Sequence, residues 1–189
     1  NAAGALGTGR YEAPFRYAEP FDRKSDLFSD EIYANLFNVA QLVSATAYTV
    51  QKNHNTEDNT DLLLDLNYGY EAFPAFSSYA INTSESKQFN QELRLVSTHG
   101  GPISWVLGGF YNRLKTKRDR HEYTPGFAEF IGSNRLDNLE YESSSNTKLI
   151  EKAFYGEATS HVTKACQIHG GLCLPNHRST TVGGHGRPP

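Results

Sequence analysis

The chain has 189 residues, of which 38% are hydrophobic and 21% charged, and its formal net charge is -3 at pH 7. This length allows one domain with a core of its own, and the mild charge gives no support for nucleic acid as a partner. No run approaches the roughly 18 apolar residues of a membrane helix, which excludes a helical membrane protein. That test misses transmembrane β-barrels, whose strands are about 9–11 residues long and half polar.

Residues 1–26 are rich in Gly, Ala, Pro and charge, so we expect irregular or edge structure there. Hydrophobic and polar residues then alternate from Leu27 to Phe37, as in a β-strand with a different environment on each face. A tight break at Phe37-Asn38 leads into Val39–Lys52, which is rich in β-branched and small residues. The two segments predict a β-hairpin.

Two long segments separate the remaining predicted strands. The first, His54–Glu85, begins acidic and turns aromatic, and it precedes a second hairpin made of Ser86–Ser97 and Ile103–Leu114. The second, Lys115–Lys148, precedes a final alternating strand, Glu151–Val162. Short turns and long loops therefore alternate along the chain. Outer-membrane barrels show this order, with short turns on one side of the membrane and long loops on the other.

The strand around Glu92 shows the difference between its two faces most clearly. Glu92 and Arg94 lie on one face, and Phe89, Leu93 and Leu95 lie on the other. An arginine that faces lipid costs about 2–4 kcal/mol at the membrane midplane, so a barrel would turn these charges toward its lumen. A soluble antiparallel sheet with one solvated face shows the same alternation. The residues alone therefore leave two hypotheses, a membrane barrel and a secreted or periplasmic β-sandwich that binds a ligand such as carbohydrate.

Four segments resemble strands from the barrel of TonB-dependent outer-membrane receptors. Gln91–Ser97 (QELRLVS) resembles a recurrent strand of that family, and Trp105–Tyr111 (WVLGGFY) resembles the strand that follows it after a short turn. Phe154–Thr159 (FYGEAT) resembles a later strand, and Leu42–Tyr48 (LVSATAY) resembles an earlier one. Their order and spacing agree with the family over residues 27–163, so the sequence is similar to part of such a barrel.

The resemblance implies an importer in the outer membrane of a Gram-negative bacterium. In this family a barrel of about 22 strands is closed by a plug, and the cargo is a scarce ligand such as a ferric siderophore, cobalamin or an oligosaccharide. A TonB-type energy-coupling protein in the periplasm pulls on the plug. The resemblance therefore implies three partners, namely the TonB-type energy-coupling protein, outer-membrane lipid and the cargo.

The sequence also departs from the family, because the plug, the coupling box and the C-terminal aromatic signature are not visible in it. It contains no Met, and we expect it to be an internal piece of a longer protein. Five or six strands cannot close a barrel, so we expect this piece to transport nothing alone. Gln167–Leu172 weakly suits a strand, and the residues beyond it read as neither strand nor helix. For residues 164–189 as a whole we predict an atypical, disordered or frameshifted tail.

We predict an all-β fold of antiparallel, up-and-down transmembrane strands that form an incomplete barrel with long extracellular loops. We predict that the chain is divided into irregular or edge structure (1–26), part of a barrel (27–163) and a tail (164–189). The side chains predicted to face the lumen are Glu31, Glu92, Arg94 and Glu157, and those predicted to face lipid are Phe89, Leu93, Leu95, Trp105 and Phe154.

Two groups in the long segments are candidates for binding. Aromatic rings suit flat apolar cargo, and the alternative is that they pack together and keep the loops compact. The candidates are Tyr68, Tyr70, Phe73, Phe76, Tyr123 and Phe127. A basic run either attracts an anionic ferric complex or lipopolysaccharide phosphates, or is a solvated strand extension. It consists of Lys115, Lys117, Arg118 and Arg120.

The candidates for metal binding and catalysis are weak. Cys166, His169, Cys173 and His177 offer four zinc-ligand types, but their spacing matches no familiar zinc pattern. The acidic cluster Glu57, Asp58, Asp61 and Asp65 lacks the Gly-centred loop of an EF-hand. No nucleophile elbow or phosphate loop is present, although a pair of glycosidase carboxylates would be visible only in a structure. We predict no metal, no cofactor and no catalytic residue.

Overall fold

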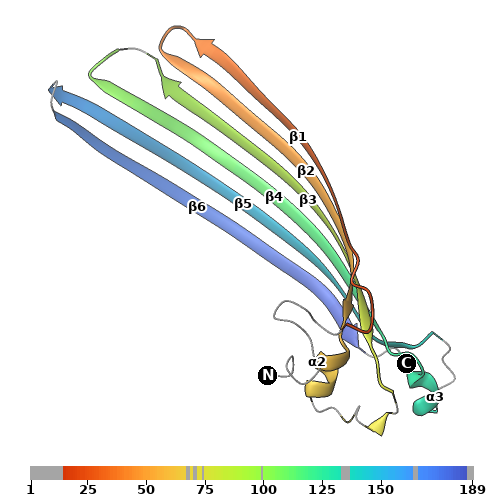
Figure 1. The fold of residues 1–189 in the computed structure, drawn as a ribbon. Coiled ribbons are helices and arrows are strands. Elements are labelled where there is room, and N and C mark those ends of the chain that lie inside the picture. Colours follow the sequence, from red (N-terminus) through yellow and green to blue (C-terminus); the bar gives the residue numbers. More distant parts are fainter. Residues whose placement is uncertain are drawn as a thin grey trace.

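The computed structural model describes residues 15–66, 69, 72–73, 75–98, 100–132, 137–163 and 166–186. In this part of the chain, six antiparallel strands form one sheet in sequence order (Figure 1). The strands are β1 (Phe21–Leu36), β2 (Ala40–Asp58), β3 (Tyr79–Ser97), β4 (Ile103–Tyr123), β5 (Leu139–Thr163) and β6 (Cys166–Gly186). Two short helices, α2 (Thr60–Asp65) and α3 (Phe127–Phe130), lie in the connections. The predicted all-β, up-and-down fold in an unclosed sheet is confirmed.

The connections are sorted by length between the two ends of the sheet. Residues 37–39 form a short turn at one end, where β3 ends at Ser97 and β4 begins at Ile103, and the segments with α2 and α3 lie at the other end (Figure 1). The predicted break at Phe37-Asn38 is confirmed, because both residues have positive φ (50° and 57°) and Val39 N donates to Leu36 O at 3.0 Å. Positive φ at both central residues gives the turn the twist that a hairpin requires.

The strands are longer than their apolar pattern predicted. They contain 16 to 25 residues, and β3 begins at Tyr79 while β4 continues to Tyr123. Both ends of each predicted long segment are therefore strand and not loop, namely 54–58 and 79–85 in the first and 115–123 and 139–148 in the second. From Asn82 to Glu85 and from Lys115 to Tyr123 both faces of the sheet are polar, so the alternation that marks a strand in the sequence is missing, although the backbone ladder continues.

The terminal segments also differ from the prediction. Strand β1 begins at Phe21, before the predicted start at Leu27. Cys166–Gly186 is the edge strand β6, paired with β5, so the predicted disordered tail is wrong for these residues. Backbone pairing holds β6, and its side chains from Cys166 to His185 are exposed. An edge strand tolerates proline, which explains how Pro175 is accommodated in β6. Whether this segment is in the true reading frame stays a prediction.

The described strands form one layer, with little core. The buried hydrophobic side chains are few, namely Ala40, Val43, Leu63, Phe76, Ala80 and Ala128. Leu63 and Phe76 form a small cluster with partly buried neighbours at the end with the long loops. The two packed sheets that the sandwich hypothesis requires are not present among the described residues. No helix in the described part of the chain has the length and apolar character needed to cross a membrane.

Pairing assigns each strand residue to one of two faces, because directly opposite residues share a face. We name these the Glu92 face and the Leu93 face. The Glu92 face is the more crowded. In β5, the side chains of residues 143, 145 and 147 on this face are partly buried, whereas those of 142, 144 and 146 on the Leu93 face are exposed. Crowding of this kind is expected on the concave side of a curved sheet, and Figure 1 shows the sheet curving along its strands.

Candidate functional site

The register brings each predicted set of side chains onto a single face. Glu92 lies opposite Ala45, which lies opposite Glu31, so both carboxylates share the Glu92 face. By the same pairing, the Glu92 face holds Glu31, Glu92, Arg94 and Glu157, and the Leu93 face holds Phe89, Leu93, Leu95, Trp105 and Phe154. The orientation of these faces toward water and lipid stays a prediction.

A charged cluster links β1, β3 and β5 on the Glu92 face. Arg94 Nη2 lies 4.0 Å from Glu31 Oε1, and Arg94 Nε lies 3.6 Å from Glu92 Oε1. Arg94 Nε is buried and makes no hydrogen bond within the described residues. The Tyr155 hydroxyl donates a hydrogen bond to Glu92 Oε1. Because both ion pairs are long and partly exposed, each contributes about 0–1 kcal/mol to stability.

Gly108 makes the contact between Tyr155 and Glu92 possible. Tyr155 is on β5 and Glu92 is on β3, so the tyrosine ring has to cross β4 at Gly108, which lies opposite Tyr155. A Cβ built on Gly108 would lie 2.2 Å from Cζ of Tyr155. The absence of a side chain at this position therefore gives the ring its path. The sequence did not reveal this contact, because it depends on the relative register of three strands.

A second polar ladder lies closer to the long loops on the same face. The Arg120 guanidinium lies 3.0 Å from Glu57 Oε2 and 2.8 Å from Glu122 Oε1, and it donates to Asn82 Oδ1 at 3.0 Å. These residues connect β2, β3 and β4. The predicted basic run is thereby divided, since Arg118 and Arg120 lie on the Glu92 face and Lys115 and Lys117 on the Leu93 face.

The Leu93 face carries large apolar side chains that are exposed. The exposed fractions are 48% for Leu93, 53% for Leu107 and 70% for Phe154, and on β6 they are 66% for Leu172 and 60% for Leu174. Leu93, Gly109 and Phe154 are directly paired across three strands. A contiguous apolar patch of this kind marks a surface that contacts lipid or another protein.

Most of the predicted loop aromatics pack against one another. Phe73, Phe76 and Phe127 belong to the cluster at the end with the long loops, and Phe73 stacks on Phe130 with ring centroids 4.7 Å apart. Tyr123 stacks on Tyr79 at 5.4 Å. Tyr68 and Tyr70 lie outside the described residues. Phe76 is only 7% exposed, so little of its ring is open to a ligand, and cargo binding by this group stays a prediction.

The metal-ligand candidates do not converge on one point. Cys166 and His177 are separated by about 36 Å along the extended strand β6, at ~3.3 Å per residue. His169 Nδ1 instead lies 3.4 Å from Glu157 Oε1. Among the described residues, no group of three or more His, Cys, Asp or Glu side chains is arranged to hold a metal ion. The acidic cluster is dispersed, because Glu57 contacts Arg120 and Asp61 contacts Arg16.

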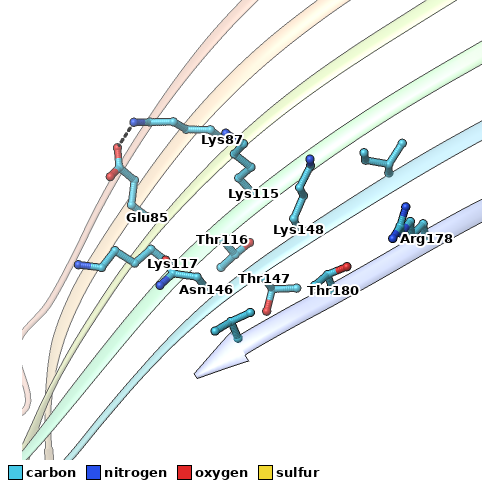
Figure 2. Close-up of a pocket in the computed structure, with 12 residues that line it drawn as sticks. Glu85, Lys87, Lys115, Thr116, Lys117, Asn146, Thr147, Lys148, Arg178 and Thr180 are labelled. Atoms are coloured by element: carbon cyan, nitrogen blue, oxygen red, sulfur yellow. Dashed lines mark ion pairs between the residues drawn. The ribbon is translucent and has the colours of Figure 1, made fainter. Parts of the chain in front are cut away.

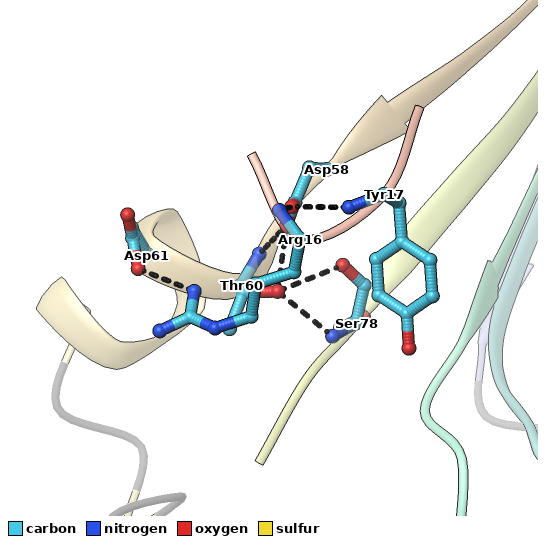
Figure 3. A network of polar contacts seen from close by, with 6 residues as sticks. All are labelled: Arg16, Tyr17, Asp58, Thr60, Asp61 and Ser78. Atoms are coloured by element: carbon cyan, nitrogen blue, oxygen red, sulfur yellow. Dashed lines mark hydrogen bonds and ion pairs between the residues drawn. The ribbon is translucent and has the colours of Figure 1, made fainter. Parts of the chain in front are cut away.

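Asp58 organises the connection at the end with the long loops (Figure 3). Its carboxylate accepts hydrogen bonds from the backbone N–H groups of Arg16, Tyr17 and Thr60, and from the Thr60 hydroxyl at 2.6 Å. The Thr60 hydroxyl in turn accepts from Ser78 N at 3.1 Å, and its oxygen lies 3.2 Å from Ser78 O. The network ties the segment before β1 to both ends of the β2–β3 connection.

We expect this network to loosen in acid. Burial raises the pKa of Asp58, but the hydrogen bonds from Thr60, Tyr17 and Arg16 outweigh burial and hold the pKa below its ordinary value of 3.8. A depressed pKa means that the stabilisation is complete above the ordinary value and is lost as the pH falls through the folded-state pKa. Hydrogen exchange at the Tyr17 and Thr60 amides, corrected for intrinsic rates, should lose protection below pH 3.8, while the Ala47 amide in β2 serves as control. Protection that falls identically in Asp58→Asn would contradict this assignment.

Comparison with known proteins gives a likeness of fold. No protein-family model matches the chain, and no curated protein sequence matches it. The crystal structure of the ferric yersiniabactin uptake receptor FyuA from Yersinia pestis is similar, with a TM-score of 0.66, 17% identity and coverage of 93% of this chain. The siderophore receptor PiuA from Acinetobacter baumannii aligns at a TM-score of 0.40 and 10% identity, covering 90% of this chain and 31% of its own.

The match spans 26% of the FyuA chain, so this sequence corresponds to about a quarter of that receptor's length. At 17% identity the likeness shows the fold alone. It agrees with the predicted fold class, an incomplete sheet of antiparallel, up-and-down strands.

Proposed function

We propose that this sheet is part of the wall of an outer-membrane receptor, with the Leu93 face against lipid and the Glu92 face toward the lumen. The observation that carries the proposal is the division of side chains between the faces of a one-layer sheet. One face exposes Leu93, Leu107 and Phe154, and the other pairs Arg94 with Glu31 and Glu92. The fold shared with FyuA supports it.

The exposed apolar residues favour lipid as the solvent of the Leu93 face. Removing one large apolar side chain from water is worth about 1.5–3 kcal/mol, so a patch that crosses several strands would promote aggregation in water. Hydrocarbon covers such a patch without a second sheet. This explains why the sheet lacks a partner layer among the described residues.

The length of the strands also fits a membrane wall. Strand β3 has 19 residues, which at ~3.3 Å per residue is about 63 Å. Tilted by ~45°, such a strand rises about 44 Å, which exceeds the ~30 Å thickness of the hydrocarbon core. The surplus lies at the end with the long loops, where the Leu93 face changes from apolar to charged at Lys87 and Lys115. The barrel segment predicted as 27–163 is thus proposed to extend over the whole sheet, 21–186.

In the complete receptor this wall serves the energised uptake of a scarce ligand, such as a ferric siderophore, cobalamin or an oligosaccharide. FyuA is a ferric yersiniabactin uptake receptor, and that supports the class of function without assigning the cargo. Glu31, Glu92, Arg94 and Glu157 line the lumen and contact the plug, on which a TonB-type protein pulls from the periplasm. The wall carries out no bond chemistry.

Spin labels on neighbouring residues test the orientation of the two faces. In a background with Cys166→Ser and Cys173→Ser, which removes both free cysteines, labels are placed at Leu93→Cys and Leu95→Cys, and at Glu92→Cys and Arg94→Cys. In lipid vesicles we expect the first pair to be accessible to oxygen but not to a water-soluble nickel complex, and the second pair to show the reverse. An immobile label at 93 that neither reagent reaches, in a particle that needs no detergent, would contradict the proposal and favour the sandwich.

A further inference from the structure

Three lysines stand side by side on the Leu93 face near the long loops. Lys87 on β3 is directly opposite Lys115 on β4, which is directly opposite Lys148 on β5. Adjacent strands lie about 4.8 Å apart, and like charges at directly opposite positions destabilise a sheet. We call these three residues the lysine row. Because this arrangement destabilises the protein by itself, we expect an anion from outside the protein to neutralise it.

The surroundings of the lysine row do not neutralise it. A groove of about 650 Å³ contains the row together with Lys117 and Arg178, and Glu85 is the carboxylate that lines it (Figure 2). Glu85 lies 2.9 Å from Lys87 and 4.0 Å from Lys52. Lys117 lies 3.1 Å from Asp119 Oδ2. Within the described residues, no carboxylate lies at ion-pair distance from Lys115, Lys148 or Arg178. We call this surface the basic groove, and it is strongly cationic in a chain of net charge -3.

The basic groove begins where the apolar surface ends. Along β3, Lys87 follows Phe89 on the same face toward the long loops, and along β5, Lys148 follows Ile150. Asn146 and Thr180 line the same groove and provide neutral hydrogen-bond donors. A phosphorylated lipid has the same order of parts, with apolar chains followed by an anionic headgroup. Lysine side chains at such a boundary extend their ammonium groups toward the headgroups.

We infer that the basic groove binds the phosphate groups of lipids in the membrane leaflet on the side of the long loops. The inference rests on the proposed function, since it requires the Leu93 face to contact lipid. Lysine ammonium groups pair with the phosphate oxygens, while the neighbouring leucines and Phe154 contact the acyl chains. The lipid then supplies the charge that the lysine row lacks, and the receptor is held at a fixed depth.

The test compares neutral and charge-conserving variants of the complete receptor in nanodiscs. Binding of a fluorescent bis-phosphorylated lipid is measured in a background of neutral phosphatidylcholine. Each lysine near an anionic surface contributes about a fivefold change in binding, so Lys115→Gln should weaken binding about fivefold and Lys115→Gln/Lys148→Gln about 25-fold. The Lys115→Arg/Lys148→Arg variant should retain it. Arg118→Gln is the matched control, because Arg118 is an exposed cation on β4 that lies on the Glu92 face.

Further measurements separate the possible failures. In the wild-type receptor, the phosphorylated lipid should slow amine-reactive labelling of Lys115 and Lys148, and phosphatidylcholine should not. This measurement does not depend on the folding of any variant. Unchanged binding in the double glutamine variant would overturn the inference, and so would displacement of the lipid by millimolar inorganic phosphate, which would indicate a site for the free anion. If either result occurs while the label at 93 reports lipid, only this inference fails. If that label does not report lipid, the proposed function fails with it.

Discussion

Leu93→Arg is expected to destabilise the inserted barrel by about 2–4 kcal/mol, because it places a charge on the Leu93 face in the apolar band. Leu93 is 48% exposed, and its neighbours across the sheet are Ser44 and Gly109, neither of which can pair with a guanidinium. In water, the same change at a half-exposed position would fall within about 0.5 kcal/mol. The size of the effect therefore reports which solvent covers this face.

A matched substitution on the opposite face serves as control for Leu93→Arg. Asn90 lies on the same strand but on the Glu92 face, opposite Ala47 and Asn112. Asn90→Arg should change stability by less than about 1 kcal/mol, because the lumen is aqueous. The measurement is urea unfolding of the complete barrel in lipid vesicles, followed by the gel mobility of unheated samples. Equal losses for both variants, or no loss for Leu93→Arg, would contradict the assignment of lipid to the Leu93 face.

The two faces could be predicted from the sequence, because that prediction needs only to know whether a residue has an odd or an even position along its strand. In an up-and-down sheet, the odd or even position of a residue and the pairing of its strand decide which face its side chain lies on. Strands β2 and β3 pair without a register shift along their whole length. Glu92 and Leu93 therefore separate from the alternation alone. The turn at Phe37-Asn38 was also visible, because it interrupts the alternation.

The ends of the strands could not be predicted, for a physical reason. From Asn82 to Glu85, and again from Lys115 to Tyr123, both faces of the sheet carry polar side chains, so no difference in hydrophobicity marks the pleat. The ladder continues there through backbone hydrogen bonds, which every residue except proline can make. Strand β6 was missed for a different reason, because Gly170, Gly171 and Pro175 are residues that strands disfavour.

The contacts within the candidate site could not be predicted from the sequence, because they depend on the register between neighbouring strands. The sequence gives no sign that Arg120 meets Glu57, or that Lys87, Lys115 and Lys148 align in one row. A shift of two residues between β3 and β4 would preserve every face, but it would separate Arg120 from Glu57 and Lys87 from Lys115. Faces follow from a period of two, whereas partners require the exact alignment of neighbouring strands.

Gly108→Ala is expected to destabilise the barrel by about 1.5–3 kcal/mol, which is the contribution of a hydrogen bond to a charged group. The new Cβ would lie 2.2 Å from Cζ of Tyr155, so the ring has to swing off β4 and lose Glu92. Backbone strain is not involved, because the φ of Gly108 lies outside the positive range. Urea unfolding in vesicles measures the change.

Gly109→Ala is the matched control, because Gly109 is the next residue on β4 and lies on the Leu93 face. Its Cβ would be 3.5 Å from the ring of Phe154, an ordinary contact, so we expect no loss and a gain of up to about 1 kcal/mol from the restricted unfolded chain. In a Tyr155→Ala background, where no ring crosses β4, the cost of Gly108→Ala should disappear. A cost that persists without the tyrosine would contradict this account, because it would show that the cost of Gly108→Ala arises in β4 itself and not from displacing the Tyr155 ring.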